Sequence, residues 1–344
     1  MIGVYYKHNA PGGMAAVIQY YSQYIENLQY IPSWKLTNII GRTWYAISAI
    51  ISVIIKLSFN RKIKILHIHS AADASYHRKM IFVKIGKKMG RKVIFHIHAS
   101  RFKDFYNEQT EKNKRKIQKE LMLPDKLLVL SESWKNWFKS INIPVEKIEV
   151  LHNITEDPII HPHKPDCKIH LLFLGELGQR KGIFDLLQAI ANNKEEFRNQ
   201  IELRIGGNKN EGKLKEFILI NNLTDFVFFE GWVSGNKKRE LLNWADIYIL
   251  PSFNEGLPIG ILEAMSYQCA IISTPVGGIP EVVIPYKNGL LITPGNTIEI
   301  SEAIRTLIKV DNLESYKKES EHISQAYLPD SVMKHLIEIY NQLL

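Results

Sequence analysis

Cysteine is almost absent from this chain, which has only two, Cys167 and Cys269, among 344 residues. Two cysteines so far apart cannot build a disulfide framework or a zinc site of four thiolates. The sequence therefore indicates a protein that folds without covalent cross-links, and a reducing, cytoplasmic setting is the default expectation.

Long hydrophobic runs are also missing. The longest covers residues 44–55, between Arg42 and Lys56. Crossing a bilayer takes about 20 apolar residues, so we expect no spanning helix. Residues 1–6 lack the basic and apolar regions of a secretory leader and are typical of a strand. Two interpretations of residues 44–55 remain: a helix buried in the first domain, or a helix that docks on an anionic membrane surface beside the cations that follow it.

Acidic residues are scarce in the first 160 positions, which hold 25 Lys and Arg but only 12 Asp and Glu, whereas the remainder holds 19 and 23. The first part therefore carries a net charge of +13 and the rest −4. A basic surface suits phosphate-rich partners such as nucleic acid, anionic lipid or a diphosphate-linked substrate. Because no aromatic-basic motif of RNA-binding domains is present, we expect no nucleic-acid partner.

The length predicts two domains, at about 150 residues each. Residues 156–166 contain three prolines in a polar stretch and lie where the charge bias changes, so the linker is expected there. Apolar, β-rich runs alternate with segments of helical period on both sides of it. Strands are predicted at 2–6, 63–68, 92–97 and 126–130, then at 169–174, 201–205, 227–230, 247–250, 270–273 and 289–292. This alternation predicts an α/β protein of two doubly wound parallel sheets, which bind ligands beyond the carboxyl ends of their strands.

Glycines and histidines follow the predicted strands of the first domain. Gly12 and Gly13 open a helix, where backbone N–H groups and the helix dipole favour an anion such as diphosphate.

The pairs His67/His69 and His96/His98 end consecutive strands, and the period of two places each pair on one face, so the four can approach one another. Neither cysteines nor carboxylates cluster with them, which favours a substrate-contacting histidine over a zinc site.

Residues 175–182 follow a predicted strand in the second domain and end in Arg180, Lys181 and Gly182. Paired cations at such a helix start can clamp a diphosphate and neutralise the charge on a phosphate leaving group; the alternative is a solvated basic loop. The spacing of a P-loop is absent, which disfavours ATP hydrolysis.

The most specific segment is residues 251–265, with Glu255 in a Gly/Pro-rich loop and Glu263 about two turns further on, inside the next helix. Each carboxylate can accept hydrogen bonds from a different part of one long ligand, Glu263 from a diol such as ribose. A pair of surface glutamates is the alternative, but Glu263 lies among apolar neighbours, where an unpaired carboxylate is costly to bury.

With these motifs the chain resembles glycosyltransferase family 4, the retaining GT-B enzymes that use nucleotide-activated sugars. The match is strongest over residues 173–294, where Glu255 and Glu263 form the family's Glu-x7-Glu signature and residues 175–182 its Gly-x-Leu-x3-Lys-Gly loop. The resemblance implies two Rossmann-like domains facing each other across a cleft. We expect an acceptor-binding domain at 1–158, a nucleotide-sugar domain at 159–325, and a final helix at 326–344 that packs back on the first domain.

By this resemblance, Glu255 lies beside the donor sugar, Glu263 holds the ribose, Lys181 contacts the diphosphate and His98 acts near the sugar on the acceptor side. The implied catalytic residues are Glu255, His98, Lys181 and Arg180, and the implied donor-binding residues are Gly12, Gly13, Gly175, Lys181, Gly207, Val233, Glu255, Gly256, Leu257 and Glu263. One departure stands out: the family often has Arg directly after the first glycine of the loop, where this chain has Glu176. Arg180 is the candidate for the missing cation.

The expected activity is transfer of a sugar from a UDP- or GDP-linked donor to a lipid-diphosphate-linked or oligosaccharide acceptor, in synthesis of a cell-surface polysaccharide such as capsule or O-antigen. No metal or other cofactor is expected, because the chain has no Asp-x-Asp motif and cations with backbone N–H groups can take the role of a divalent ion. The expected location is the cytoplasm, peripherally on the membrane. Two alternatives remain, a nucleotide-sugar 2-epimerase and a non-catalytic basic binding protein.

Overall fold

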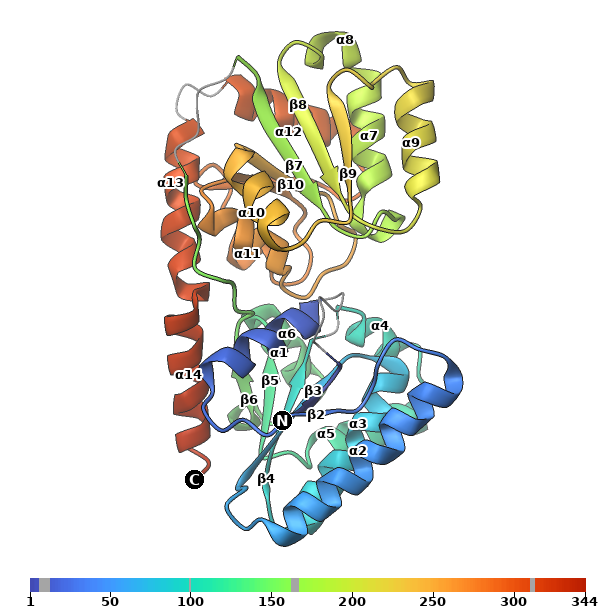
Figure 1. Cartoon of the computed structure of the whole chain (residues 1–344), viewed down its shortest axis with the longest axis vertical. Coiled ribbons are helices and arrows are strands. Elements are labelled where there is room, and N and C mark those ends of the chain that lie inside the picture. Colours follow the sequence, from blue (N-terminus) through green and yellow to red (C-terminus); the bar gives the residue numbers. More distant parts are fainter. Residues whose placement is uncertain (6–12, 99, 162–166, 310–312) are drawn as a thin grey trace. The chain divides into compact units, whose positions relative to one another are not determined.

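A computed structural model of the chain describes residues 1–5, 13–98, 100–161, 167–309 and 313–344. The chain divides into two compact units, the first made of Met1–Ile154 with Pro329–Leu344 and the second of Thr155–Leu328 (Figure 1). The boundaries thus fall at 154 and 328, whereas the sequence suggested 158 and 325. The final helix belongs to the first unit.

The first unit contains one parallel sheet of order β2-β1-β3-β4-β5-β6. Its described elements are β1 (Ile2–Gly3), α1 (Gly13–Tyr24), β2 (Ile31–Pro32), α2 (Ile39–Phe59), β3 (Ile65–Ser70), α3 (Asp73–Lys88), β4 (Lys92–Ile97), α4 (Phe102–Asn107), α5 (Glu111–Leu121), β5 (Lys126–Val129), α6 (Glu132–Ser140), the 3₁₀ turn η1 (Val145–Lys147), β6 (Ile148–Val150) and α14 (Pro329–Asn341). The four predicted strands are present. Sequence reasoning missed β2 and β6, which are too short to show an alternating pattern and lie at the two edges of the sheet, where Pro32 is tolerated.

The central strands β3 and β4 separate two different layers. Leu66, Ile68 and Phe95 point into an apolar core that they share with α2, α3, α5 and α6. The intervening residues His67, His69 and His96 are buried on the opposite face, because successive side chains of a strand alternate between its faces. The three histidines thus form a polar cluster on that face, beside the buried apolar Ile94 and Leu128.

Helix α2 starts where the Asn38 side chain accepts a hydrogen bond from the Gly41 N–H at 2.8 Å. It has 21 residues and is long and apolar enough to cross a membrane by length and composition, because its apolar character extends beyond the 12-residue run at 44–55. The interpretation of the run as a buried helix holds for one face only, since Ala49 and Val53 are buried whereas Trp44, Ile47, Ile51, Ile54 and Ile55 are exposed.

The second unit contains a parallel sheet of order β12-β11-β10-β7-β8-β9. Its described elements are β7 (Ile169–Leu174), η2 (Gln179–Lys181), α7 (Ile183–Asn192), α8 (Lys194–Phe197), β8 (Ile201–Gly206), α9 (Glu211–Ile220), β9 (Val227–Gly231), α10 (Gly235–Trp244), β10 (Ile247–Leu250), α11 (Ile259–Ser266), β11 (Ala270–Ser273), η3 (Ile279–Glu281), β12 (Gly289–Leu291), α12 (Thr297–Lys309), α13 (Leu313–Ser324) and η4 (Gln325–Tyr327). All six strands predicted here are present. The strand order reverses between β7 and β10, so the loops after these two strands flank the position where such sheets bind ligands.

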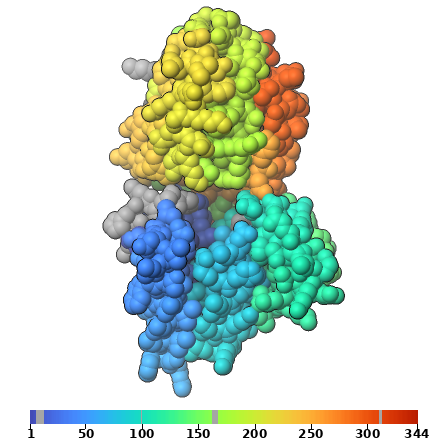
Figure 2. Space-filling view, turned by 90° about the vertical axis from the view of Figure 1, so that its right-hand side faces the viewer, coloured from blue at the N-terminus to red at the C-terminus, as the bar shows by residue number. Residues whose placement is uncertain are grey.

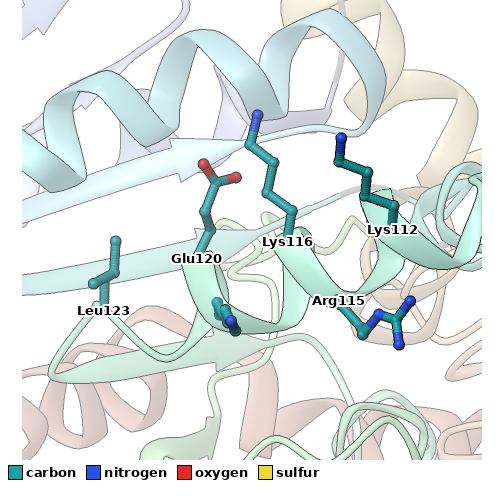
Figure 3. A pocket seen from close by; sticks show the side chains of 6 residues that line it. Lys112, Arg115, Lys116, Glu120 and Leu123 are labelled. Atoms are coloured by element: carbon teal, nitrogen blue, oxygen red, sulfur yellow. The ribbon is translucent and has the colours of Figure 1, made fainter.

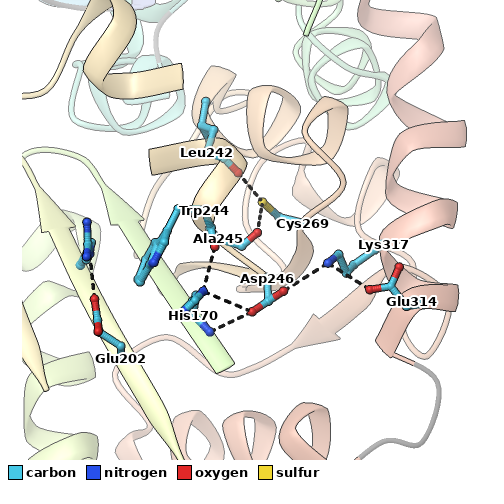
Figure 4. Close-up of polar contacts among 10 residues, drawn as sticks. His170, Glu202, Leu242, Trp244, Ala245, Asp246, Cys269, Glu314 and Lys317 are labelled. Carbon is cyan, nitrogen blue, oxygen red and sulfur yellow. Dashed lines mark hydrogen bonds and ion pairs between the residues drawn. The ribbon is translucent and has the colours of Figure 1, made fainter. Parts of the chain in front are cut away.

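A polar network occupies the opposite, amino edge of this sheet (Figure 4). The His170 N–H donates to Asp246 Oδ2 at 3.0 Å, and Lys317 Nζ of α13 lies 3.2 Å from Asp246 Oδ1. The Cys269 thiol donates to the Ala245 carbonyl at 3.4 Å, and burial raises the pKa of Cys269 to about 12. This thiol is therefore an unreactive core group, and we assign the network to stability, because ligands bind at the other edge.

Candidate active site

The loops after β7 and β10 are held against each other by their backbones. The Phe253 N–H donates to the Arg180 carbonyl at 2.8 Å. Gly182 has φ +70°, and a Cβ added there would lie 2.0 Å from the Pro251 carbonyl oxygen. Only glycine fits this contact, so the sequence -Arg-Lys-Gly- is what allows the first loop to lie so close to the second.

This contact brings three predicted site residues together. Lys181 Nζ lies 2.5 Å from Glu255 Oε1, and Arg180 Nη1 lies 3.8 Å from the same oxygen. The Glu255 side chain is only 7% exposed, and that of Lys181 is 15% exposed. A carboxylate and two cations therefore share the carboxyl edge of the sheet at the switch point, where they can contact an anionic, hydroxyl-rich ligand.

The glycines predicted to bind the donor also shape this edge. A Cβ on Gly207 would lie 2.1 Å from the Gly175 carbonyl oxygen, and one on Gly206 would lie 2.8 Å from Val233 Cγ2. The loop after β11 packs on the other side, where the Gly278 N–H donates to the Gly256 carbonyl at 2.6 Å. Gly256 and Leu257 are buried. The glycines thus bring the loops after β7, β8, β10 and β11 into close contact.

Glu176, at the position where the family often has arginine, has a cation of its own. Lys209 Nζ, in the segment after β8, lies 3.0 Å from Glu176 Oε2, and both side chains are exposed. The Arg180 guanidinium instead contacts the Asn254 carbonyl at 3.3 Å and approaches Glu255. Sequence reasoning missed Lys209, because 33 positions separate it from Glu176.

Glu263 has the partner that its burial requires. Lys238 Nζ of α10 lies 2.6 Å from Glu263 Oε1. Burial raises the pKa of Glu263, and the attraction of Lys238 opposes that shift. Burial lowers the pKa of Lys238, but the attraction of Glu263 and Glu156 outweighs it, so the net shift is upward. Sequence reasoning missed Lys238; its only signal is the basic run 237–239, which begins three residues after the α10 cap, Ser234.

In the first unit, the four histidines come together as the two-residue period predicted. His67 Nε2 lies 3.3 Å from His96 Nδ1, and His69 Nδ1 lies 2.8 Å from His98 Nε2. Tyr340 of α14 bonds His67 Nδ1 at 2.8 Å. Burial lowers the pKa of all four, that of His98 to about 3, so each imidazole is neutral at pH 7.

The Nε2 atoms of His69 and His96 have no hydrogen-bond partner in the part of the chain that the structure describes. Nitrogen atoms of His67, His69 and His96 lie within 4.8 Å of one another, close enough to be considered as metal ligands. The rings of His67 and His69, however, are stacked with planes only 14° apart and centroids 4.4 Å apart. Lone pairs of stacked rings run in parallel planes and do not converge on one ion, so the geometry favours a hydrogen-bonded histidine cluster over a metal centre.

The remaining predicted residues of the first unit are Gly12 and Gly13. Gly13 is the first residue of α1 and is exposed. Gly12 lies outside the described residues. Gly13 and His98 thus belong to the first unit, and the predicted site residues from Gly175 onward belong to the second.

Two family profiles together match residues 12–326 of this chain. The one described as Glycosyltransferase Family 4 matches residues 12–156, and the one described as Glycosyl transferases group 1 matches residues 156–326. Their junction lies within two residues of the boundary between the two units.

Two known proteins illustrate the sequence similarity. The chain is 25% identical over 231 residues to a glycosyltransferase assigned to colanic acid biosynthesis in Salmonella typhimurium. The aligned region covers 62% of this chain and 56% of that protein. The chain is 28% identical over 193 residues to the amylovoran biosynthesis glycosyltransferase of Erwinia amylovora, which covers 52% and 45%. The chain therefore matches about half the length of these relatives.

Solved structures share the fold. The structure of Anabaena HepE in complex with UDP and glucose matches with a TM-score of 0.72 at 15% identity, over 99% of this chain and 98% of that one. With the two six-stranded parallel sheets, this likeness confirms the GT-B fold predicted from the sequence.

Proposed function

The chain belongs to glycosyltransferase family 4, group 1, and from this premise we propose that it moves a sugar from a UDP- or GDP-linked donor to a glycan acceptor with retention of anomeric configuration. The observation that carries the proposal is the contact of Glu255 with Lys181 and Arg180 at the switch point of the second sheet. The bound UDP and glucose of Anabaena HepE support a nucleotide-sugar donor.

Cleavage of the anomeric bond gives the sugar positive charge and the β-phosphate negative charge. Lys181 and Arg180 would stabilise the phosphate, and the buried Glu255 would accept hydrogen bonds from the donor sugar. Glu263, held by Lys238, would accept hydrogen bonds from the ribose. With two cations at the phosphate, the reaction needs no divalent ion in this proposal.

Retention would follow from attack on the same face that the phosphate leaves, with the phosphate helping to take the acceptor proton. Glu255 then acts on the sugar without becoming a nucleophile. The neutral His98 can accept or donate a hydrogen bond at the acceptor side, because burial keeps its pKa far below 7.

For the acceptor we propose a glycan on a lipid diphosphate, used in synthesis of a cell-surface polysaccharide such as capsule or O-antigen by an enzyme in the cytoplasm. The colanic acid and amylovoran relatives support a polysaccharide, and the net charge of +13 on the first 160 residues suits an anionic acceptor.

The test is a panel of nucleotide sugars scored by thermal stabilisation, since a ligand that binds only the folded state raises the melting temperature. The donor that stabilises is then incubated with lipid-diphosphate glycan, with and without EDTA, and the new linkage is assigned by NMR. Transfer with retained configuration in EDTA is the expected result. Inversion, dependence on a metal, or epimerisation of the donor without an acceptor would each contradict the proposal.

A further inference from the structure

Helix α2 presents a continuous apolar stripe to its surroundings. Ile40, Trp44, Ile47, Ile51 and Ile54 are spaced by four and three residues, the spacing of one helix face, and all are exposed; Ile40 is 80% and Trp44 68% exposed. Residues 39–59 contain no acidic side chain. An apolar stripe of this length in water is costly, which marks it as an interaction surface.

The opposite face of α2 is fixed to its own unit. Ala49, Val53 and Leu57, each four residues apart, are at most 2% exposed and join the core beneath β3 and β4. A helix that spans a bilayer has lipid on every side, so α2 would have to give up these core contacts in order to span. Because one stripe remains packed on the sheet, α2 is suited to lie along a membrane surface with only its outer stripe in contact with lipid.

Positive charge surrounds this stripe on the same side of the unit. Apart from the buried Lys79, the helices α2, α3 and α5 together carry eleven Lys and Arg but only three acids, Asp73, Glu111 and Glu120, a net charge of +8. Figure 2 shows α2 in blue, α3 in lighter blue and α5 in teal exposed side by side on one face. Between Glu26 and Asp73 the chain has six cations and no acid.

Four of these cations line a hollow of about 500 Å³ along α5: Lys112, Arg115, Lys116 and Lys119 (Figure 3). Its one acid, Glu120, already pairs with Lys84 at 2.7 Å and accepts a hydrogen bond from Tyr76. Across the described residues, none of the four cations has an ion pair with an acid. The hollow therefore offers uncompensated positive charge to an anionic group.

We propose that this face, the outer stripe of α2 with the cations of α3 and α5, is a docking surface for an anionic lipid bilayer. The apolar side chains enter the headgroup and acyl boundary, and the cations contact lipid phosphates. A second copy of the chain is a poorer occupant, because it would bring two strongly positive faces together. The inference stands on the first unit alone and goes beyond the proposed reaction.

The test measures binding of the full chain to vesicles, by flotation, without any nucleotide sugar. Vesicles of phosphatidylcholine and phosphatidylglycerol in equal parts are compared with vesicles of phosphatidylcholine alone. Binding is expected for the anionic vesicles, with a decline as salt screens the surface charge. Alkaline carbonate should release the protein, since a peripheral helix leaves the membrane and a spanning one does not.

Two sets of variants separate the two contributions. The triple variant Ile40→Ser, Trp44→Ser, Ile51→Ser should lose binding to the anionic vesicles. The triple variant Lys112→Gln, Lys116→Gln, Lys119→Gln should weaken binding to anionic vesicles by about a hundredfold, with one cation worth roughly a fivefold change. The matched control, Leu219→Ser with Ile220→Ser on α9, makes the same change at exposed residues of the second unit and should bind like the wild type.

The variant residues touch none of the proposed catalytic groups, so hydrolysis of the donor should be unchanged in all of them. Wild-type protein that fails to bind anionic vesicles at low salt overturns the inference. Dimerisation lost in the α2 variant, without lipid binding, overturns it as well. Donor binding is measured separately, by thermal stabilisation. Failure of the proposed sugar transfer can therefore be distinguished from failure of the proposed membrane docking.

Discussion

Lys238 Nζ lies 2.6 Å from Glu263 Oε1, and this pair links α10 to α11 inside the second unit. Glu263 is buried among apolar neighbours, and its carboxylate is stable there because a cation reaches it. The carboxylate of the family signature is therefore placed by a residue that lies outside the signature.

Removal of Lys238 tests this dependence. Lys238→Met leaves an uncompensated buried carboxylate and should lower the free energy of unfolding by about 3 kcal/mol. The double variant Lys238→Met, Glu263→Gln should recover most of the loss, because the charge that needed a partner is gone. Urea unfolding of the wild type, both single variants and the double variant gives the coupling energy. Additive effects would contradict the pairing.

Glu263→Gln tests the ribose role. The amide keeps the shape of the side chain but loses a charged acceptor, so nucleotide binding should weaken by about 1 to 3 kcal/mol. Calorimetric titration with UDP and GDP measures the change. Glu281→Gln, in the loop after β11, is a control of the same chemistry. Equal affinity of the Glu263 variant and the wild type would remove Glu263 from the nucleotide site.

Glu255 and Lys181 should respond in opposite ways. Glu255→Gln removes the carboxylate that occupies Lys181 and Arg180, so UDP affinity should rise while sugar transfer is lost, since the donor sugar loses its acceptor group. Lys181→Ala should lower both. Lys209→Ala, at the exposed pair with Glu176, serves as the control. Equilibrium titration measures UDP affinity, and a transfer assay measures activity. Weaker UDP binding by the Glu255 variant would contradict the inference that Glu255 occupies the cations that bind UDP.

The histidine cluster predicts how stability depends on pH. Burial holds the pKa of His67, His69, His96 and His98 below the ordinary 6.5. At pH values between the lowered pKa of a folded-state histidine and its ordinary pKa in the unfolded chain, the histidine is protonated only in the unfolded state. Stability is therefore fully present above pH 6.5 and falls as the pH drops below it, by up to about 1.4 kcal/mol per pH unit for each histidine.

Calorimetry between pH 7.5 and about 5 measures this slope, in a range above the titration of most carboxylates. His96→Gln should reduce the slope by about one proton, whereas His322→Gln, at an exposed position of α13, should leave it unchanged. A flat profile between pH 6.5 and 5 would show that the cluster accepts protons in the folded state.

The strands of the second unit were readable from the sequence because a parallel sheet with both faces covered needs continuous apolar runs. Residues 171–174 and 247–250 are such runs, and each ends at a loop rich in glycine or proline. The signature residues Glu255 and Glu263 were readable for the same local reason, since both follow one strand at a fixed spacing.

The sequence by itself thus determined the two-unit α/β architecture, the family and the loops that carry Glu255, Glu263, Arg180 and Lys181. Only the tertiary structure decided that Lys238 is the partner of Glu263, that Lys209 pairs with Glu176, and that α2 buries one face and exposes the other. Local patterns fix periodicity and loop position, because these depend on neighbouring residues. Ion pairs and buried faces depend on residues that are distant in the chain and meet only when the strands and helices pack.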